Sequence, residues 1–509
     1  MLRSSGVVLP VSALPGPFGI GCMGKEALDF ARTILAAGFS YWQILPLGPT
    51  GSGDSPYQSF STYAGNPYLI DLRPLCEAGW LTDAELQTAT RDHMEIIDGV
   101  PYSRVDYGWL WETRRALLKT AASRLNEAER ADVSRFSDSQ DWLPDYAAFM
   151  TIKGRQGHRP WWEWPEALKL KDPSAVQKFI QPFTDEYFFH CFVQYIFRTQ
   201  WFALKAAVNE LGIKIIGDIP IYVASDSVDV WADRRWFELD DEGHQLRSAG
   251  VPPDLYTDDG QFWGNPLYRW DRLKADGYTW WLKRIKAAVD LCDIVRLDHF
   301  RGFEAYWAVE QGATLARAGV WEKGPAMDLF DPILRAFPLA PFIAEDLGYM
   351  TKEAENFVRQ TGLPGMKVLQ FHFSTDSDGE LRPHDFEKKV CAYASTHDSD
   401  TLFGWLESLD TPTWELVRDY AGIRQHDRHL GGPKSRICRS VFRVLWQTPA
   451  QLVMVQMQDL LGQGNDMRTN RPGIADGNWR IRFTPEDLEQ IDVAYFRRLN
   501  DVFQRTPSI

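Results

Sequence analysis

The sequence predicts an α/β fold, a (β/α)8 or TIM barrel with large, mainly helical insertions. Three observations support this prediction. Short apolar runs alternate with stretches of helical periodicity, which is typical of a parallel sheet. Several of these runs end in an acidic residue, and in a parallel barrel such ends meet at one mouth. The chain has 509 residues, 44% of them hydrophobic, which suits one barrel domain over residues 1–509 that carries insertions.

The predicted strands are short apolar runs bounded by turn residues or by helical periodicity. The first follows a helix expected over residues 26–37, which Gly38 ends. It leads into a loop around residues 50–59 that is too rich in Gly, Ser and Pro for regular structure. The eight strands are centred, in chain order, on Trp42, Leu69, Ile215, Val295, Ile343, Leu369, Tyr393 and Val455.

Two insertions interrupt this series. Residues 75–205 have apolar side chains three and four apart, for example Phe188, Phe192 and Ile196, and are predicted to form a helical subdomain. A second insertion covers about 225–290. Within it, residues 250–266 are acidic, punctuated by Gly and Pro, and far from any strand pattern. These features are typical of a lid loop, and we expect the segment to form one.

Composition excludes several classes of function. The net charge is −14, which argues against nucleic acid or an anionic membrane as partner. No segment approaches the ~20 apolar residues of a membrane span, and prolines interrupt the N-terminal region where a signal peptide would need an unbroken apolar run. Six scattered cysteines indicate free thiols in a reducing compartment, so we expect a cytoplasmic location. The ten histidines form no zinc-type pair, and we expect neither a metal nor a cofactor.

Four carboxylates end four different predicted strands, and we expect them to converge at the barrel mouth. They are Asp218, Asp298, Glu345 and Asp398. Glycoside chemistry needs such a set, because one carboxylate attacks the anomeric carbon while another protonates the leaving oxygen. The 21 tryptophans are compatible with stacking on sugar rings, although most are expected in the core.

The neighbours of each carboxylate suggest its role. Arg296 shares a strand face with Asp298 and should keep it ionised as a nucleophile; for this segment alone, a structural Arg–Asp pair is an equal alternative. Glu345 follows an apolar run that should raise its pKa, as an acid/base needs. Asp398 is placed to bind sugar hydroxyls. His299 and His397 are candidate donors to the same hydroxyls.

Sequence motifs along the whole chain resemble the amylomaltase, or 4-α-glucanotransferase, family of the α-amylase-type barrels. VRLDHFRGF, IAEDLG and STHDSDT resemble its catalytic strand ends. LPLGPT, GDSPYQSFSTYAGNPYLIDLRPL, GDIPIYVASDSVDVW, GVPPDLYTDDGQFWGNP, TNRPG and GNW resemble further family motifs. A chance occurrence of this many motifs in the same order is negligible.

The resemblance implies Asp298 as nucleophile, Glu345 as acid/base and Asp398 as the stabiliser of the transition state. It also implies a set of substrate-binding residues, several of them at the donor sugar. These are Tyr57, Asp218, Gln261, Trp263, Arg296, His299, His397 and Asn470. Three positions depart from the family pattern without touching the catalytic carboxylates, namely Ser374, Asp385 and Ser399.

The resemblance implies transfer of α-1,4-glucan segments to the 4-hydroxyl of an acceptor by a retaining double displacement. Maltooligosaccharides, amylose and starch would be the substrates. An α-amylase-like hydrolase with the same carboxylates is the first alternative, because water exclusion decides between transfer and hydrolysis. A catalytically silent glucan-binding protein is the second. The sequence leaves open whether the chain is a monomer or a dimer.

Overall fold

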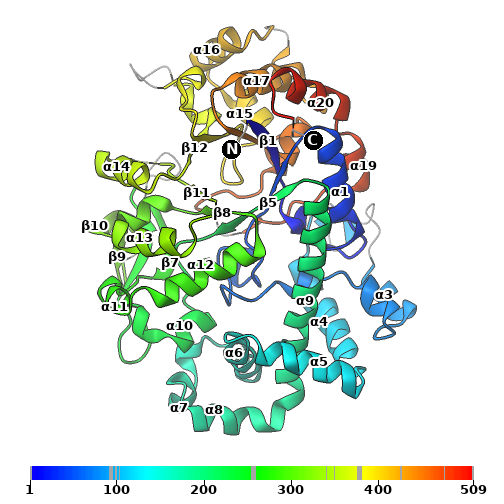
Figure 1. Ribbon diagram of the computed structural model, residues 1–509, viewed down its shortest axis with the longest axis vertical. Coiled ribbons are helices and arrows are strands. Elements are labelled where there is room, and N and C mark those ends of the chain that lie inside the picture. The colour runs from blue at the N-terminus through cyan, green and yellow to red at the C-terminus, as the bar shows by residue number, and fades with distance from the viewer. Residues whose placement is uncertain are drawn as a thin grey trace.

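Eight parallel strands form the centre of the molecule in a computed structural model (Figure 1). The model describes residues 3–90, 96–97, 100–101, 104–253, 259–313, 315–339, 341–348, 350–374, 381–424, 427–474 and 476–506. The central strands are β1 (Ser4–Val8), β2 (Tyr41–Gln43), β5 (Lys214–Ile219), β8 (Ile294–Leu297), β11 (Phe342–Ala344), β12 (Gly365–Val368), β13 (Val390–Tyr393) and β14 (Leu452–Gln456).

The strands follow one another around the ring in chain order, with β14 pairing back onto β1. The ring closes between β11 and β12, where the Ala344 backbone N–H donates to the Pro364 carbonyl oxygen at 2.9 Å. The predicted (β/α)8 barrel is therefore confirmed.

Helices surround the barrel and build the insertion that extends below it in Figure 1. They are α1 (Lys25–Ala36), α2 (Arg73–Glu77), α3 (Asp83–Thr88), α4 (Tyr107–Ser123), α5 (Glu127–Asp138), α6 (Leu143–Arg155), α7 (Glu166–Lys169), α8 (Pro173–Ile180), α9 (Thr184–Glu210), α10 (Val228–Ala232), α11 (Trp270–Ala275), α12 (Thr279–Leu291), α13 (Met327–Ala336), α14 (Lys352–Thr361), α15 (Leu402–Ser408), α16 (Thr411–Ala421), α17 (Arg436–Gln447), α18 (Met457–Leu460), α19 (Pro485–Glu489) and α20 (Val493–Val502).

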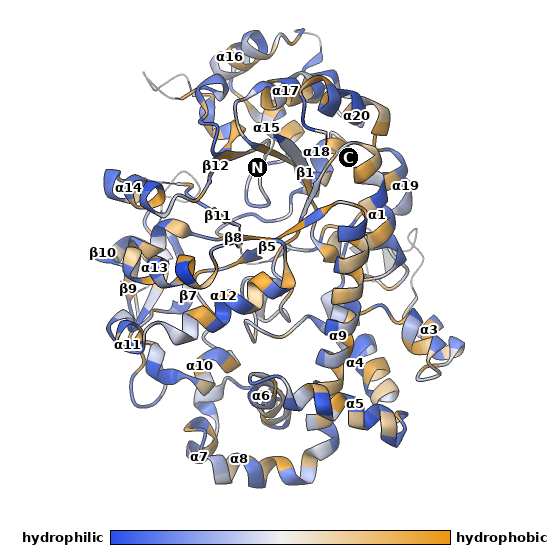
Figure 2. Ribbon diagram, viewed as in Figure 1, coloured by the Kyte–Doolittle hydropathy of each residue, from blue (hydrophilic) through white to orange (hydrophobic). Residues whose placement is uncertain are grey.

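Strand alternation divides the apolar side chains into two cores. In β8, Ile294 belongs to the cluster inside the barrel, whereas Val295 and Leu297 belong to the cluster between the barrel and its helices. The helices accordingly carry apolar residues on one side and polar residues on the other (Figure 2). Arg296 therefore points into the barrel, as the alternation predicts.

One predicted strand is wrong, one is displaced and another strand was missed. The displaced strand, β12, ends at Val368, one residue before its predicted centre Leu369, which begins a 3-10 helix. Residues 67–69 form a short 3-10 helix rather than a strand centred on Leu69, because the Asn66 side chain caps the turn and Pro67 presets its first dihedral angle. The eighth strand is instead β1, which was missed because its sequence, SSGVV, is partly polar. Gly6 is required there, since an added Cβ would lie 2.7 Å from Met454 Sδ.

A second, antiparallel sheet was also not predicted. It is formed by β6 (Arg247–Val251), β7 (Gln261–Pro266), β9 (Ala305–Glu310) and β10 (Val320–Lys323), and a small hairpin pairs β3 (Ile96–Ile97) with β4 (Val100–Pro101). The expected loop over 250–266 is thus strand at both ends, while its centre, 254–258, lies outside the described residues. Backbone pairing with β9 decides the strand geometry here, and it is not visible in local composition.

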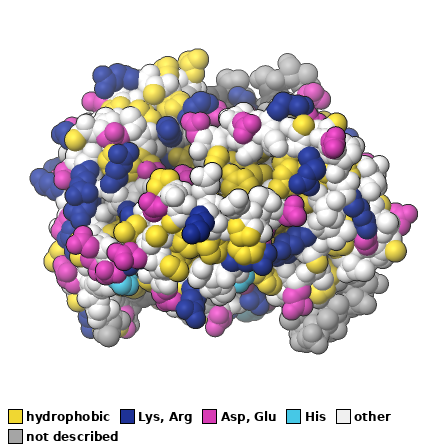
Figure 3. All heavy atoms as spheres, turned by 90° about the horizontal axis from the view of Figure 1, so that it is seen from below, with side chains coloured by type: hydrophobic (Ala, Val, Ile, Leu, Met, Phe, Trp, Pro, Cys, Tyr) yellow, Lys and Arg dark blue, Asp and Glu magenta, His cyan; other side chains and the backbone are white. Residues whose placement is uncertain are grey.

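The surface is mixed in character. On the face seen from below, charged side chains of both signs surround apolar ones that gather across the middle (Figure 3). Among the residues that the model describes, no helix is both long and apolar enough to cross a membrane.

Candidate active site

The four predicted carboxylates meet at the mouth of the barrel. Asp218 lies in β5, paired in register with Arg296 of β8. Asp298 and Glu345 directly follow β8 and β11. Asp398 lies in the loop after β13. Parallel strands bring these positions together because their carboxyl ends share one side of the barrel.

Arg296 connects three of these carboxylates. Its Nη1 donates to Asp218 Oδ1 and Oδ2 at 2.8 and 2.7 Å and lies 3.0 Å from Asp298 Oδ1. Its Nη2 lies 4.0 Å from Glu345 Oε2. The side chains of Arg296 and Asp218 are almost fully buried, so this cation supports the acidic cluster with little screening by solvent.

Burial raises the pKa of Asp298 to about 6, and the Asp218 and Asp398 charges act in the same direction. Arg296 lowers this pKa, in the direction expected from the sequence, but desolvation outweighs the effect of a guanidinium that is shared with Asp218. Asp298 is nevertheless easier to ionise than Glu345. Burial, reinforced by the Asp298 charge, raises the pKa of Glu345 to about 8.

Backbone donors orient the Glu345 carboxyl group. The N–H groups of His299 and Leu347 donate to Oε2 and Oε1 at 2.7 and 2.9 Å. The preceding apolar strand buries the group, as the sequence predicts. A buried carboxyl group with a raised pKa can retain a proton near neutral pH and give it to a leaving oxygen.

Asp398 has the opposite electrostatics. Burial would raise its pKa, but His397 and Asn470 outweigh burial and lower it to about 2. His397 Nε2 lies 3.0 Å from Asp398 Oδ2, and Asn470 Nδ2 donates to Oδ1 at 2.6 Å. Burial would likewise lower the pKa of His397, but the Asp398 carboxylate raises it. Asp398 is thus a fixed anion at the mouth.

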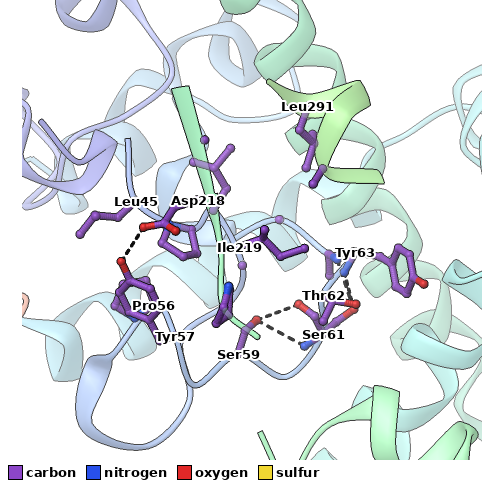
Figure 4. Close-up of a pocket in the computed structure, with 18 of the residues that line it drawn as sticks. Leu45, Pro56, Tyr57, Ser59, Ser61, Thr62, Tyr63, Asp218, Ile219 and Leu291 are labelled. Atoms are coloured by element: carbon purple, nitrogen blue, oxygen red, sulfur yellow. Dashed lines mark hydrogen bonds between the residues drawn. The ribbon is translucent and has the colours of Figure 1, made fainter. Parts of the chain in front are cut away.

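Tyr57 joins the two sides of the site. Its hydroxyl donates to Asp218 Oδ2 at 2.7 Å (Figure 4) and lies 3.0 Å from His397 Nε2. The rings of Tyr57 and His397 are stacked, with centroids 5.5 Å apart. Burial keeps the pKa of the phenol well above its ordinary value, so the hydroxyl group remains a donor.

His299 and Trp263, two of the predicted substrate-binding residues, are in contact with each other. Their rings meet edge to face with centroids 4.8 Å apart. His299 Nε2 is buried and lacks a hydrogen-bond partner among the described residues, so it can donate to or accept from a ligand. Trp263 Nε1 donates to Gln261 Oε1 at 3.2 Å, which places the predicted residue Gln261 beside this pair.

Two of the spaces beside the loop that carries Tyr57 differ in size. The cavity drawn in Figure 4, lined by Asp218, Tyr57 and Leu291 among others, has a volume of about 80 Å³, too small for a sugar chain. A cleft of about 560 Å³ is lined by Gln58, Trp111 and Trp162, and this volume lies within the usual range for ligand sites.

Several residues that support the site were not predicted from the sequence. Arg468 Nη2 donates to the Asp398 carbonyl oxygen at 2.5 Å, and Asp459 accepts from Ser395 Oγ and the Leu402 N–H. Each lies far in sequence from the loop that it holds. The TNRPG and GNW motifs lie close to Arg468 in the sequence, but they did not predict these hydrogen bonds.

Comparisons with known proteins agree with the resemblance. The family model described as 4-alpha-glucanotransferase matches residues 9–488. A 4-alpha-glucanotransferase of Thermus thermophilus is 41% identical over 99% of both chains, and one of Clostridium butyricum is 40% identical over 93% of this chain and 94% of its own. An amylomaltase from Streptococcus agalactiae, solved in complex with acarbose, superposes with a TM-score of 0.93 at 36% identity, covering 99% of this chain and all of the other.

Proposed function

We propose that this chain, which belongs to the 4-alpha-glucanotransferase family, transfers α-1,4-glucan segments through a covalent glycosyl-enzyme. The observation that supports this most directly is geometric: two partly buried carboxyl groups, at the ends of two paired strands, lie beside the same guanidinium of Arg296. Burial raises the pKa of Asp298 to about 6 and that of Glu345 to about 8. A nucleophile and an acid need this difference.

In the first step Asp298 attacks the anomeric carbon of the donor while Glu345 protonates the departing glycosidic oxygen. The bond to the leaving glucan breaks, and a glycosyl ester forms on Asp298. In the second step Glu345, now ionised, removes the proton from the 4-hydroxyl of an acceptor glucan, whose oxygen displaces Asp298. The products are a new α-1,4 bond and the starting protonation states.

Asp398 and His397 would bind hydroxyl groups of the sugar that undergoes reaction, and these contacts would strengthen as the ring flattens in the transition state. Asn470 would keep Asp398 in place. Tyr57 and Trp263 would present ring faces to the glucan, Asp218 would hold Arg296 beneath the reacting carbon, and His299 and Gln261 would bind further hydroxyls.

Disproportionation of maltotriose tests the function. Transfer produces both longer and shorter maltooligosaccharides, whereas hydrolysis produces only shorter ones. We expect maltotetraose and maltopentaose in the product mixture by chromatography. Glucose and maltose without any longer product would mean that water, not a glucan, resolves the intermediate.

The intermediate itself can be trapped. In Glu345→Gln, a maltosyl fluoride can still glycosylate Asp298 because fluoride leaves without protonation, but no base then activates an acceptor. Intact-protein mass spectrometry should show the added maltosyl group on this variant. The same treatment of Asp298→Asn should add nothing, and a modified Asp298→Asn protein would contradict the assignment of the nucleophile.

We also propose that the enzyme works in the cytoplasm. All six cysteines are free and five of them are buried, which suits a reducing compartment. Because the chain belongs to the 4-alpha-glucanotransferase family, we propose maltooligosaccharides, amylose and starch as its substrates.

A further inference from the structure

Trp479 has a backbone conformation that bulky residues rarely adopt. Its φ angle is 64°, in the left-handed region, where a Cβ atom is strained. Two hydrogen bonds hold it there. The Trp479 N–H donates to the Thr469 carbonyl oxygen at 2.8 Å, and its carbonyl oxygen accepts from the Tyr107 hydroxyl at 3.2 Å. Such strain persists where the surrounding structure demands it, often at functional sites.

The strained backbone directs the indole ring against two residues of the active site. Its centroid lies 5.6 Å from the ring of Tyr57 and 6.0 Å from the ring of His397. Those two rings are themselves stacked. The three rings therefore form one cluster, defined here as the Tyr57–His397–Trp479 cluster, in which Trp479 contacts both of the other members.

The residues on either side of Trp479 make contacts that fix two loops beside the site. The Asn478 side chain accepts from the Arg471 N–H at 2.9 Å and donates to the Ile474 carbonyl oxygen at 2.8 Å, which fixes the loop that begins after Asn470. Arg480 Nη2 donates to Asp54 Oδ2 at 2.8 Å, in the loop that carries Tyr57. Asn478 thus fixes its own loop, while Trp479 and Arg480 link that loop to distant parts of the chain.

The packing of Trp479 matters most for the orientation of the His397 ring. Its Nε2 is within hydrogen-bond distance of both Tyr57 and Asp398, at 3.0 Å each. A small tilt of the imidazole lengthens one of these contacts, and hydrogen bonds weaken steeply with distance and angle. The indole of Trp479 supports the stacked rings against such a tilt.

We propose that Trp479 is a positioning residue, which acts through Tyr57 and His397 and does not itself contact the reacting atoms. The inference rests on the function proposed above for these two residues. Its physical basis is packing: the indole limits the movement of two rings whose polar atoms have to remain in register with Asp398. A purely structural tryptophan would affect stability without acting selectively through His397.

Trp479→Gly separates the two roles, because glycine adopts a positive φ without strain and loses only the ring. We expect kcat on maltotriose to fall between about tenfold and 100-fold, as for other small misplacements of catalytic groups. Trp479→Phe should restore most of the loss. Trp80→Ala, which removes a half-buried indole from the helical insertion, should leave kcat unchanged. If Trp479→Gly does not fold, Trp479→Asn replaces it, since asparagine tolerates this backbone region.

A double-mutant cycle with His397→Ala tests the route of the effect. If part of the effect passes through His397, the loss of kcat caused by Trp479→Gly should be several-fold smaller in the His397→Ala background than in the wild type. An equal loss in both backgrounds, or wild-type kcat in Trp479→Gly, would overturn the inference.

A readout independent of turnover separates this inference from the proposed function. In ¹⁵N-histidine-labelled protein, the pKa of His397 distinguishes the two effects of Trp479→Gly. Loss of burial alone would raise this pKa, whereas a looser contact with Asp398 lowers it, and we expect it to fall; Arg296, Asp218 and Tyr57 also face this ring. A wild-type protein inactive on maltotriose would refute the function and leave this measurement valid. An unchanged or raised His397 pKa would refute the positioning role.

Discussion

Arg296 Nη1 lies 3.0 Å from Asp298 Oδ1 while the same atom donates to both carboxylate oxygens of Asp218. One buried guanidinium thus serves two carboxylates. Because it lowers the pKa of Asp298 against the effect of burial, it governs both the stability of the barrel mouth and the ionisation of the proposed nucleophile.

Arg296→Met should therefore destabilise the protein and change its pH dependence. Leaving the buried Asp218 without its cation should cost about 3–5 kcal/mol in the free energy of unfolding, measured by urea denaturation. The acidic limb of the pH–rate profile should move to higher pH. Lys367→Met, which removes a looser ion pair with Asp346, should cost less than about 1 kcal/mol. Equal losses in the two variants would contradict this account.

The pH dependence of kcat/KM should be bell-shaped with its maximum near neutral pH. Asp298 has to be ionised, so the rate falls as the pH drops below about 6. Glu345 has to be protonated, so the rate falls as the pH rises above about 8. Because the two groups interact, the measured values describe the pair. A profile that stays flat between about pH 4 and 9 would be incompatible with these roles.

Glu345→Gln should lower the rate of maltotriose disproportionation by about 10²–10⁴-fold, the usual contribution of a general acid–base group. The adjacent carboxylate offers a matched control. Asp346 accepts from the Met366 N–H at 2.6 Å and pairs with Lys367 rather than with Arg296, so Asp346→Asn should keep most of the wild-type rate. Comparable losses in both variants would point to a general disturbance of the strand end.

The same Glu345→Gln change should stabilise the fold at higher pH. The folded-state pKa of Glu345 is raised, so its contribution to stability is fully present below the unfolded pKa and is lost as pH rises through about 8. The variant lacks this dependence. Its melting temperature should exceed that of the wild type by a growing margin, a few degrees, between pH 5 and pH 8 in calorimetry. A pH-independent difference would argue against a raised pKa.

Trp263→Ala should increase hydrolysis relative to transfer. The indole contacts His299 at the rim, and its removal should admit water and weaken acceptor binding. The ratio of longer products to newly formed reducing ends should fall several-fold. Phe262→Ala is the control, because the neighbouring ring points to the other side of β7 and is 48% exposed. A similar shift in both variants would exclude a specific role for Trp263.

Local sequence signals predicted the parts of the site that lie at strand ends. Strand periodicity placed Arg296 and Asp298 on one face, and the apolar run before Glu345 predicted its raised pKa. The same signals failed for β1 and for residues 67–69. In β1, the polar residues of SSGVV gave no strand signal, although the strand is buried by pairing with β2 and β14. At residues 67–69, Asn66 and Pro67 favour a turn over a strand.

By itself the sequence determined the barrel, the order of its acidic strand ends and the family, because alternation and motif spacing are local properties of the chain. Only the tertiary structure decided how these groups interact. The raised pKa of Asp298, the sharing of Arg296 and the support of Tyr57 and His397 by Trp479 arise from burial and from contacts between segments up to hundreds of residues apart, whose energies depend on distance and desolvation rather than on sequence position.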